Sequence, residues 1–253
     1  MKKLSLLCSV IILMTALSSC LESKDTSSAD VIVPVVVDYN MSYGSYLSAF
    51  YYGPVVPDNI NVLNDYATGD CAIAKITIDL NKQNPSAYYI TGSNVMLEKI
   101  ETTTPHYDLQ PDDTAGYSFP ALSVDFFSMS FSPYYLGKFF VSVSDSIASK
   151  QAVEYDLTYK QMPDEDGIFD FYLKGKVIGI SGKKEYITQY HAFDFTDIIM
   201  AAGKDTVITY GQEQEQRWRY LKFRLKYFGG TGDDLQFRNV GVGIDTIACN
   251  LDN

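Results

Sequence analysis

The two histidines are the side chains best suited to acid–base or metal chemistry, and neither has an obvious partner in the sequence. His106 and His191 are the only histidines in the chain, and neither stands in a metal-ligand spacing such as H-E-x-x-H. The sequence also contains no G-x-S-x-G turn and no glycine-rich phosphate loop. We expect His191 to be a core or turn residue. We predict no catalytic residues and no enzymatic activity.

Acidic residues cluster at three places, which raises the question of calcium. The clusters are Asp112-Asp113, Asp164-Glu165-Asp166-Gly167 and Gly232-Asp233-Asp234. Calcium takes several oxygen ligands from one tight loop, and the second cluster comes nearest, but it lacks the further spaced acids of an EF-hand. A hairpin turn in which Asp166-Gly167 supplies positive φ explains the same residues. We predict no metal site and no cofactor.

Aromatic residues gather before Gly53-Pro54 and again before Gly137. Tyrosine combines a flat apolar face with a polar tip, which suits sugar rings and protein interfaces when it is exposed. The same residues are what a β-sandwich buries between its sheets, and core packing is the favoured interpretation. If a ligand surface exists, we expect it on the first stretch. The candidate ligand-binding residues are Tyr43, Tyr46, Tyr51 and Tyr52.

The stretch 217–228 is basic on an otherwise acidic chain. Its alternation places Leu221, Phe223 and Leu225 on one face and Lys222, Arg224 and Lys226 on the other, as in a strand with one buried face. We expect these charges to pair with neighbouring acids on a solvated face. A groove for an anionic ligand is the alternative.

The elements that would hold these residues are strands. Tyr, Phe, Val, Ile and Thr recur in short runs separated by Gly, Pro, Asn and Asp, and several runs alternate with period two. In 75–80, for example, Ile76, Ile78 and Leu80 share one face. Only 193–202 has a helical pattern, with Thr196 as a cap and Gly203 as a stop. We predict an all-β fold, an antiparallel sandwich or barrel architecture of two β units with one short helix.

The first twenty residues have the pattern of a targeting segment, and we exclude them from the predicted fold. Lys2 and Lys3 precede an apolar run, and Leu17-Ser18-Ser19-Cys20 follows it, the order of a secretory signal peptide. The segment resembles the bacterial lipobox, which implies cleavage after residue 19 and lipid modification of Cys20, palmitate included. The apolar run is short for a transmembrane helix; an uncleaved anchor is the less favoured alternative.

Residues 20–30 are polar and predict a flexible tether. Position 21 is Leu rather than Asp, so the lipoprotein resemblance implies the outer membrane rather than the inner one. Glu22 and Asp25 form a sparse version of the acidic surface-export signal of Bacteroidetes lipoproteins. We expect a lipid-anchored protein on the cell surface or on the periplasmic face.

Charge and cysteine content restrict the partners. The formal net charge is −11, which repels phosphates and argues against nucleic acid as a partner. In the mature chain Cys20 carries lipid, leaving Cys71 and Cys249. These two could form a disulfide in an oxidising compartment. Two separately buried thiols are the favoured alternative.

A stretch rich in breakers, 102–116, divides the chain. It predicts a small N-terminal β domain over 31–104 and a C-terminal β-sandwich over 117–253. This organisation resembles uncharacterised Bacteroidetes lipoproteins and, in layout, the NigD-like group, which implies an OB-like barrel followed by a sandwich. No functional residue is carried over from that resemblance.

We expect a non-enzymatic binding module for a glycan or protein partner, attached to the membrane through Cys20. Two alternatives remain. One is a structural or assembly subunit of a surface complex. The other is a glycoside hydrolase, because two carboxylates suffice for that chemistry and spacing alone does not reveal them.

Overall fold

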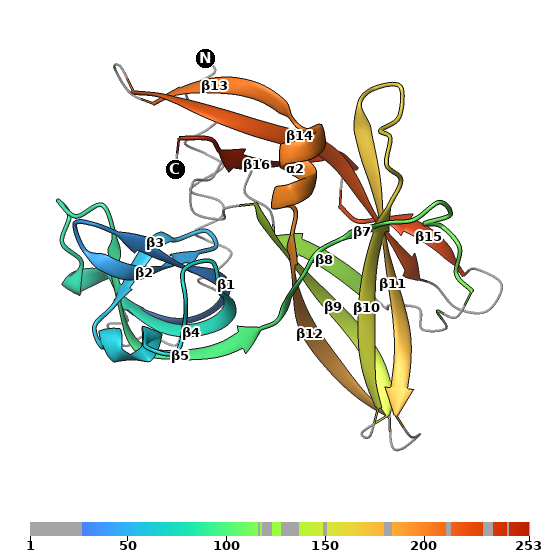
Figure 1. The fold of residues 1–253 in the computed structure, drawn as a ribbon. Coiled ribbons are helices and arrows are strands. Elements are labelled where there is room, and N and C mark those ends of the chain that lie inside the picture. The colour runs from blue at the N-terminus through green and yellow to red at the C-terminus, as the bar shows by residue number, and fades with distance from the viewer. Residues whose placement is uncertain are drawn as a thin grey trace, which may run out of the picture.

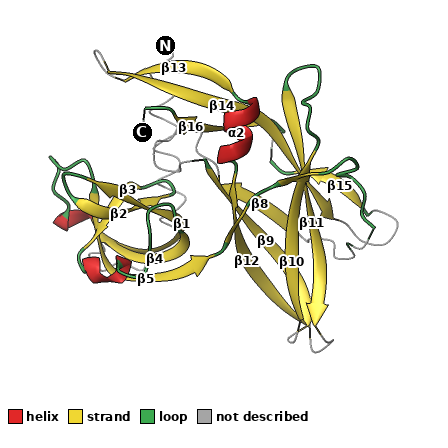
Figure 2. Ribbon diagram, in the orientation of Figure 1, coloured by secondary structure: helices red, strands yellow, loops and turns green. Residues whose placement is uncertain are grey.

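The chain folds into a barrel followed by a sandwich of two sheets, as Figure 1 shows. This computed structural model describes residues 27–115, 117, 123–127, 137–148, 151–179, 184–210, 214–229, 235–241 and 243–252. Strands account for most of the described chain (Figure 2). The all-β prediction is therefore confirmed. None of the described helices is long and apolar enough to cross a membrane.

Five strands close the barrel in the order β1-β2-β3-β5-β4. Neighbouring strands are antiparallel, except that β3 runs parallel to β5. The barrel strands are β1 (Ser28–Asn40), β2 (Gly44–Ala49), β3 (Gly53–Pro57), β4 (Cys71–Asp79) and β5 (Ile90–Ile100), with 3-10 turns η1 (Ile60–Leu63) and η2 (Leu80–Lys82). Inward-facing Val, Leu, Ala and Ile side chains fill its interior. This filling makes the barrel a packed core rather than an internal pocket.

Two expectations at the edges of the barrel are wrong. The tether was predicted to extend to residue 30, but β1 begins at Ser28, because Ser28, Ala29 and Asp30 pair with the end of β4. Leu80 does not continue the alternation of Ile76 and Ile78, and its side chain is 71% exposed. The Asp79 carboxylate accepts a hydrogen bond from the Asn81 N–H at 3.0 Å, which ends the strand and starts η2.

The sandwich contains a seven-stranded sheet, β13-β14-β11-β10-β7 with β15 and β16 added along β14, and a four-stranded sheet, β6-β12-β9-β8. The strands of the larger sheet are β7 (His106–Tyr107), β10 (Gln151–Tyr159), β11 (Ile168–Gly179), β13 (Lys204–Tyr210), β14 (Gln214–Gly229), β15 (Gln236–Asn239) and β16 (Asp245–Asn250). Those of the smaller sheet are β6 (Thr102–Thr103), β8 (Ser123–Phe127), β9 (Lys138–Ala148) and β12 (Lys184–Asp194).

A phenylalanine cluster lies at the centre of the sandwich. Phe139, Phe171, Phe195 and Phe223 are each fully buried. The Phe195 ring centroid lies 4.7 Å from that of Phe171 and 5.4 Å from that of Phe139. Such tilted and edge-to-face contacts add to the stabilisation from burial. These four phenylalanines are therefore core residues, whereas the side chains of the aromatic stretch before Gly137 lie outside the described residues.

The helical prediction is confirmed with a different cap. Helix α2 spans Thr196–Ala202, and its N-cap is Phe195 rather than Thr196. The Asp194 carboxylate accepts a hydrogen bond from the Thr196 N–H at 2.9 Å. Asp194, the residue before the N-cap, therefore satisfies one of the free backbone donors at the start of the helix. Gly203 ends the helix at φ −70°. A Cβ there would lie 2.4 Å from the Ile199 carbonyl oxygen, so glycine is required for space rather than for its backbone freedom.

The segment expected to be a linker belongs to the sandwich. Thr102 and Thr103, which we assigned to the N-terminal domain, pair with β12 in the smaller sheet. His106 and Tyr107 pair with β10 in the larger one. Both pairings are parallel and short, which is why the many breaker residues did not suggest strands. The segment crosses from one sheet to the other, as the green chain in Figure 1 shows.

Residues 105–115 and Tyr117, which we call the strap, lie against β10 and β11 around a buried lysine. Lys174 is 2% exposed, and its Nζ donates to the Asp113 carbonyl oxygen at 3.0 Å. It also lies 4.5 Å from the centre of the Tyr117 ring. The Tyr117 hydroxyl donates to Asp156 at 2.5 Å, and that hydrogen bond raises the pKa of Tyr117 to about 12. A buried charge with these partners attaches the strap to the sheet.

Replacing Lys174 by methionine is expected to lower the free energy of unfolding by about 2–3 kcal/mol, because a hydrogen bond from a charged donor is lost while side-chain volume is kept. Urea unfolding measures this, and limited proteolysis shows whether the strap becomes accessible. Lys176→Met is the matched control, since Lys176 lies on the same strand and is exposed. Equal stability of the two variants contradicts the assigned role of Lys174.

The acidic cluster at 164–167 and the basic residues of β14 both take the structural roles that the sequence favoured. Gly167 has φ 76°, and Asp164 Oδ1 accepts from the Asp166 and Ile168 N–H groups, so the acidic cluster is a hairpin turn. Arg224 donates to Asp170 at 2.6 Å and Lys226 to the same carboxylate at 2.9 Å. These basic residues pair with acids as expected, and no groove for an anion is needed to explain them.

The disulfide alternative is wrong, because Cys71 and Cys249 are both free and buried. Cys71 lies where the barrel meets the sandwich, and Cys249 lies in the sandwich core. Burial raises the pKa of both thiols. Both residues therefore behave as small apolar side chains.

Candidate ligand cleft between the barrel and the sandwich

The barrel and the sandwich meet at a small apolar contact. Val36, Phe50 and Cys71 of the barrel pack with Phe140 and Ala192 of the smaller sheet. Alternation along β12 explains the geometry: Ala192 faces the barrel, whereas Phe193 belongs to the sandwich core. The outer face of one sheet thus touches the outer wall of the barrel at one end.

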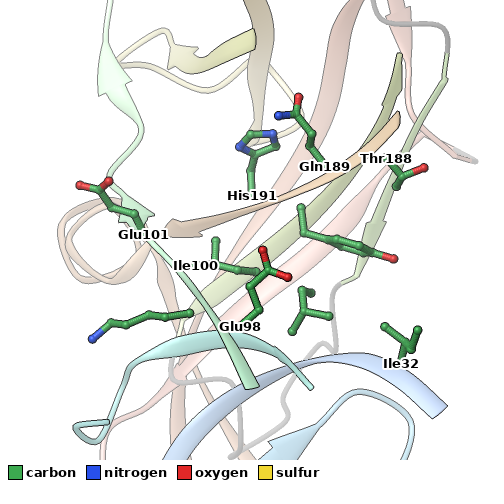
Figure 3. A pocket seen from close by; sticks show the side chains of 10 residues that line it. Ile32, Glu98, Ile100, Glu101, Thr188, Gln189 and His191 are labelled. Atoms are coloured by element: carbon green, nitrogen blue, oxygen red, sulfur yellow. The ribbon is translucent and has the colours of Figure 1, made fainter. Parts of the chain in front are cut away.

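Beyond this contact the two faces separate and leave a cavity of about 520 Å³ (Figure 3). It is bounded by strands β1, β4 and β5 of the barrel and by β12 of the sandwich. A shallower hollow of about 210 Å³ continues along the barrel and shares Ile32, Ile73 and Glu98 with it. Together they form what we call the cleft. Its volume lies in the range of small-ligand sites.

The barrel wall of the cleft is built from cross-strand rows. The inner row is Pro34, Ile73 and Glu98, which lie side by side on β1, β4 and β5. The outer row is Ile32, Lys75 and Met96. Ile32 is 63% exposed and Met96 is 66% exposed. Ile32 and Met96 therefore place exposed apolar surface directly beside the cavity.

The sandwich wall of the cleft is richer in hydroxyl groups. Thr188 and Tyr190 line the cavity, and the Thr188 hydroxyl lies 3.0 Å from that of Ser144 on β9. Figure 3 shows His191 and Gln189 on the other side of β12 from Ile100 and Glu98. The His191 ring lies 4.7 Å from Tyr155 on β10, so it points between the sheets.

His191 is therefore a core residue, as the sequence predicted, although a poorly satisfied one. Its Nε2 and the Oε1 of Gln189 are buried without a hydrogen-bond partner among the described residues. Burial lowers the pKa of His191 to about 4, so the imidazole is neutral at pH 7. His106 lies on β7, where its Nδ1 is 3.2 Å from Asp156.

The charges around the cleft are unevenly matched. The Lys99 ammonium donates to Asp70 at 2.6 Å and lies 5.8 Å from the centre of the Tyr66 ring. Although burial raises the pKa of Asp70, hydrogen bonds from Lys99 and the Ala67 N–H lower it overall. Glu98 and Glu101 have no ion-pair partner within the described part of the chain. Two carboxylates are thus available to a ligand.

The four candidate tyrosines do not converge on one site. Tyr43 and Tyr46 form an edge-to-face pair 5.2 Å apart. Tyr46 is buried, and its hydroxyl donates to Asp38 at 2.6 Å; burial and this carboxylate raise its pKa. Tyr51, at φ 66°, and Tyr52 lie in the turn at the other end of β2, where Tyr52 packs against the barrel core. The four tyrosines are close in sequence, but they do not form one continuous ligand-binding surface.

Tyr43 instead meets a residue that we did not single out. Its ring centroid lies 5.0 Å from that of Tyr89, in the segment before β5. Tyr88 beside it is 93% exposed. The adjacent pair of tyrosines was visible in the sequence, but nothing local linked it to residue 43.

Sequence reasoning also missed the cleft itself. Its deeper cavity is lined by Ile32, by Ile73 and by two short runs, 98–101 and 188–191, and none of these carries a recognisable motif. An exposed isoleucine on a predicted strand was the one available signal. The predicted lipidation site, Cys20, and the signal peptide 1–19 lie outside the described residues. Within those residues no group of three or more His, Cys, Asp or Glu is placed to hold a metal ion.

No family model matches the sequence, and no curated protein matches it either. Among solved structures, the chain is similar to an uncharacterized protein from Parabacteroides merdae, with 14% identity, a TM-score of 0.55, and 85% of this chain and 97% of that chain covered. At this identity the likeness shows a shared fold alone.

Two further structures of similar fold come from Bacteroides. One is a NigD-like immunity protein from Bacteroides caccae, with 11% identity, a TM-score of 0.47, and 88% and 95% of the two chains covered. The other is a protein of unknown function from Bacteroides vulgatus, with 16% identity, a TM-score of 0.45, and 83% and 96% covered. The structural neighbours thus include uncharacterised Bacteroidetes proteins and a NigD-like protein.

Proposed function

We propose that this chain is a non-enzymatic binding protein, held at the outer membrane by lipid on Cys20, that takes its ligand in the cleft between barrel and sandwich. The observation that carries the proposal is the cavity of about 520 Å³, which is bordered by the exposed Ile32 and by two carboxylates, Glu98 and Glu101, that have no ion-pair partner among the described residues. A cavity with a few polar groups among apolar ones is the usual form of a ligand site.

The orientation of His191 supports binding rather than catalysis. A general acid or base must reach the proton that it transfers. His191 borders the cavity, but its ring lies on the other side of β12 from Ile100 and Glu98 and contacts Tyr155. The groups that do face the cavity, such as Thr188, Tyr190 and Glu98, can donate or accept hydrogen bonds to a bound ligand.

Filling the cleft tests this function. Thr188→Trp places a large side chain in the cavity and is expected to weaken ligand binding at least tenfold. Thr209→Trp is the control, because Thr209 is exposed on β13, away from the cleft. Both variants and the parent are screened against a peptide library and a glycan array. The proposal fails if no ligand distinguishes Thr188→Trp from the parent.

Attachment through Cys20 has its own expected result. Cys20→Ala is expected to abolish labelling by radioactive palmitate and to move the protein from the membrane fraction to the soluble one, because two or more acyl chains are what hold such a protein stably. Cys71→Ala, at a buried free thiol, should leave labelling unchanged. Protease shaving of intact cells then separates the cell surface from the periplasmic face.

A glycan on the barrel is a second candidate, favoured by the tyrosine pair Tyr43 and Tyr89 beside the exposed Tyr88. Exposed tyrosine rings can stack on sugar rings. A glycan bound there should be lost in Tyr88→Ala and retained in Thr188→Trp. Tyr51→Ala, at the other end of β2, is the matched control.

A further inference from the structure

The chemistry of the cleft identifies a class of ligand. The barrel wall carries Ile32, Ile73 and Met96, which are aliphatic. Exposed aromatic rings are what suit the faces of sugar rings, and among the described residues Tyr190 is the only Phe, Tyr or Trp that lines the deeper cavity. Exposed aliphatic side chains are better matched by the apolar side chains of another protein.

The charged side chains are distributed unevenly along the cleft. Glu98 and Glu101 line the deeper cavity, and Lys99, which lies between them in sequence, is already held by Asp70. Lys75 lines only the outer hollow, between Ile32 and Met96. The deeper cavity therefore carries two carboxylates without an ion-pair partner among the described residues, whereas the outer hollow carries Lys75 beside Glu98, which it shares with the deeper cavity.

The spacing of the rows matches an extended peptide. The inner and outer rows are two residues apart on each strand, which corresponds to about 6.6–6.8 Å. Alternate side chains of an extended peptide have the same separation. A peptide that lies along the barrel strands can place the side chain of one residue at Glu98. The side chain two residues further along the peptide then lies between Ile32 and Met96.

We propose that the ligand of the cleft is a short extended segment of a partner protein with the pattern basic-x-apolar, whose lysine or arginine pairs with Glu98 and Glu101 and whose apolar residue contacts Ile32 and Met96. This inference rests on the proposed function of the cleft. A guanidinium or ammonium on these carboxylates forms charge-assisted hydrogen bonds, which supply specificity.

Synthetic peptides test the inference. The probe is Gly-Ser-Arg-Ser-Leu-Ser-Gly, with Glu in place of Arg and Ser in place of Leu as the comparison peptides. Binding to the purified mature chain is followed by methyl NMR of Ile32, Ile73 and Ile100, which detects weak complexes. The arginine peptide is expected to shift these signals, and each comparison peptide to bind at least tenfold more weakly.

Matched variants separate specific pairing from general attraction to an acidic protein. The double variant Glu98→Gln with Glu101→Gln should weaken the arginine peptide about tenfold. Glu154→Gln, exposed on β10, lowers the negative charge without touching the cleft and should leave binding unchanged. Lys75→Gln should strengthen a peptide whose basic residue lies at the outer position, because it removes a like charge.

The outcomes distinguish this inference from the function on which it rests. Equal binding of the Arg and Glu peptides, or no effect of the Glu98 and Glu101 changes, overturns the basic-x-apolar pattern. If Thr188→Trp abolishes the binding of a neutral glycan but the Glu98 and Glu101 changes do not affect it, the basic-x-apolar inference fails and the binding function stands. If no ligand responds to Thr188→Trp, both fail.

Discussion

Replacing Phe195 by alanine is expected to lower the free energy of unfolding by about 3–5 kcal/mol, a large part of the stability of an ordinary domain. Phe195 is fully buried at the junction of β12 and α2. Its ring contacts those of Phe139, Phe171 and Phe223, which come from three other strands. Removing the Phe195 ring leaves a cavity bordered by the β12–α2 junction and by β9, β11 and β14, all of which would have to move to fill it.

Urea unfolding followed by Trp218 fluorescence measures this loss. Trp218 is the only tryptophan and is fully buried on β14, so its signal reports on the sandwich rather than on the barrel. Phe237→Ala is the control, because Phe237 is half-buried at the edge of the sheet and should cost less than half as much. A Phe195→Ala protein as stable as this control would contradict the placement of the core.

Acidification from pH 7.5 to pH 4.5 is expected to destabilise the protein by about 2–3 kcal/mol through His191 alone. Burial lowers the pKa of this imidazole from 6.5 to about 4. Above pH 6.5 the side chain is neutral in both states and contributes nothing. Between pH 6.5 and pH 4 only the unfolded chain binds the proton, so stability falls as the pH falls.

His191→Phe isolates this contribution. Phenylalanine keeps a ring against Tyr155 and removes an Nε2 that has no hydrogen-bond partner among the described residues. The variant should therefore be at least as stable as the parent at pH 4.5 and lose most of the pH dependence in this range. Carboxylates whose pKa is lowered, such as Asp194, act at lower pH. Identical pH profiles for His191→Phe and the parent would contradict the burial of His191.

Local pattern predicted much of the fold because strands and turns depend on neighbouring residues. Alternation placed Leu221, Phe223 and Leu225 in the core, where they are buried. Asp166-Gly167 formed the expected turn, since only the residues beside it are needed to satisfy the backbone. The strand pairings of Thr102–Thr103 were not predicted, because two residues carry too little pattern to reveal a partner 90 positions later.

The sequence by itself determined the all-β class, the core face of β14 and the presence of a short helix within 193–202, because each follows from the order of apolar and polar residues over a few positions. The tertiary structure alone decided where a ligand could bind. It separated Tyr43 from Tyr51, brought Tyr43 to Tyr89, and assembled the cleft from Ile32, Ile73, Glu98 and Tyr190. These residues meet because strand register and the contact between barrel and sandwich are non-local, and no short stretch of sequence encodes either.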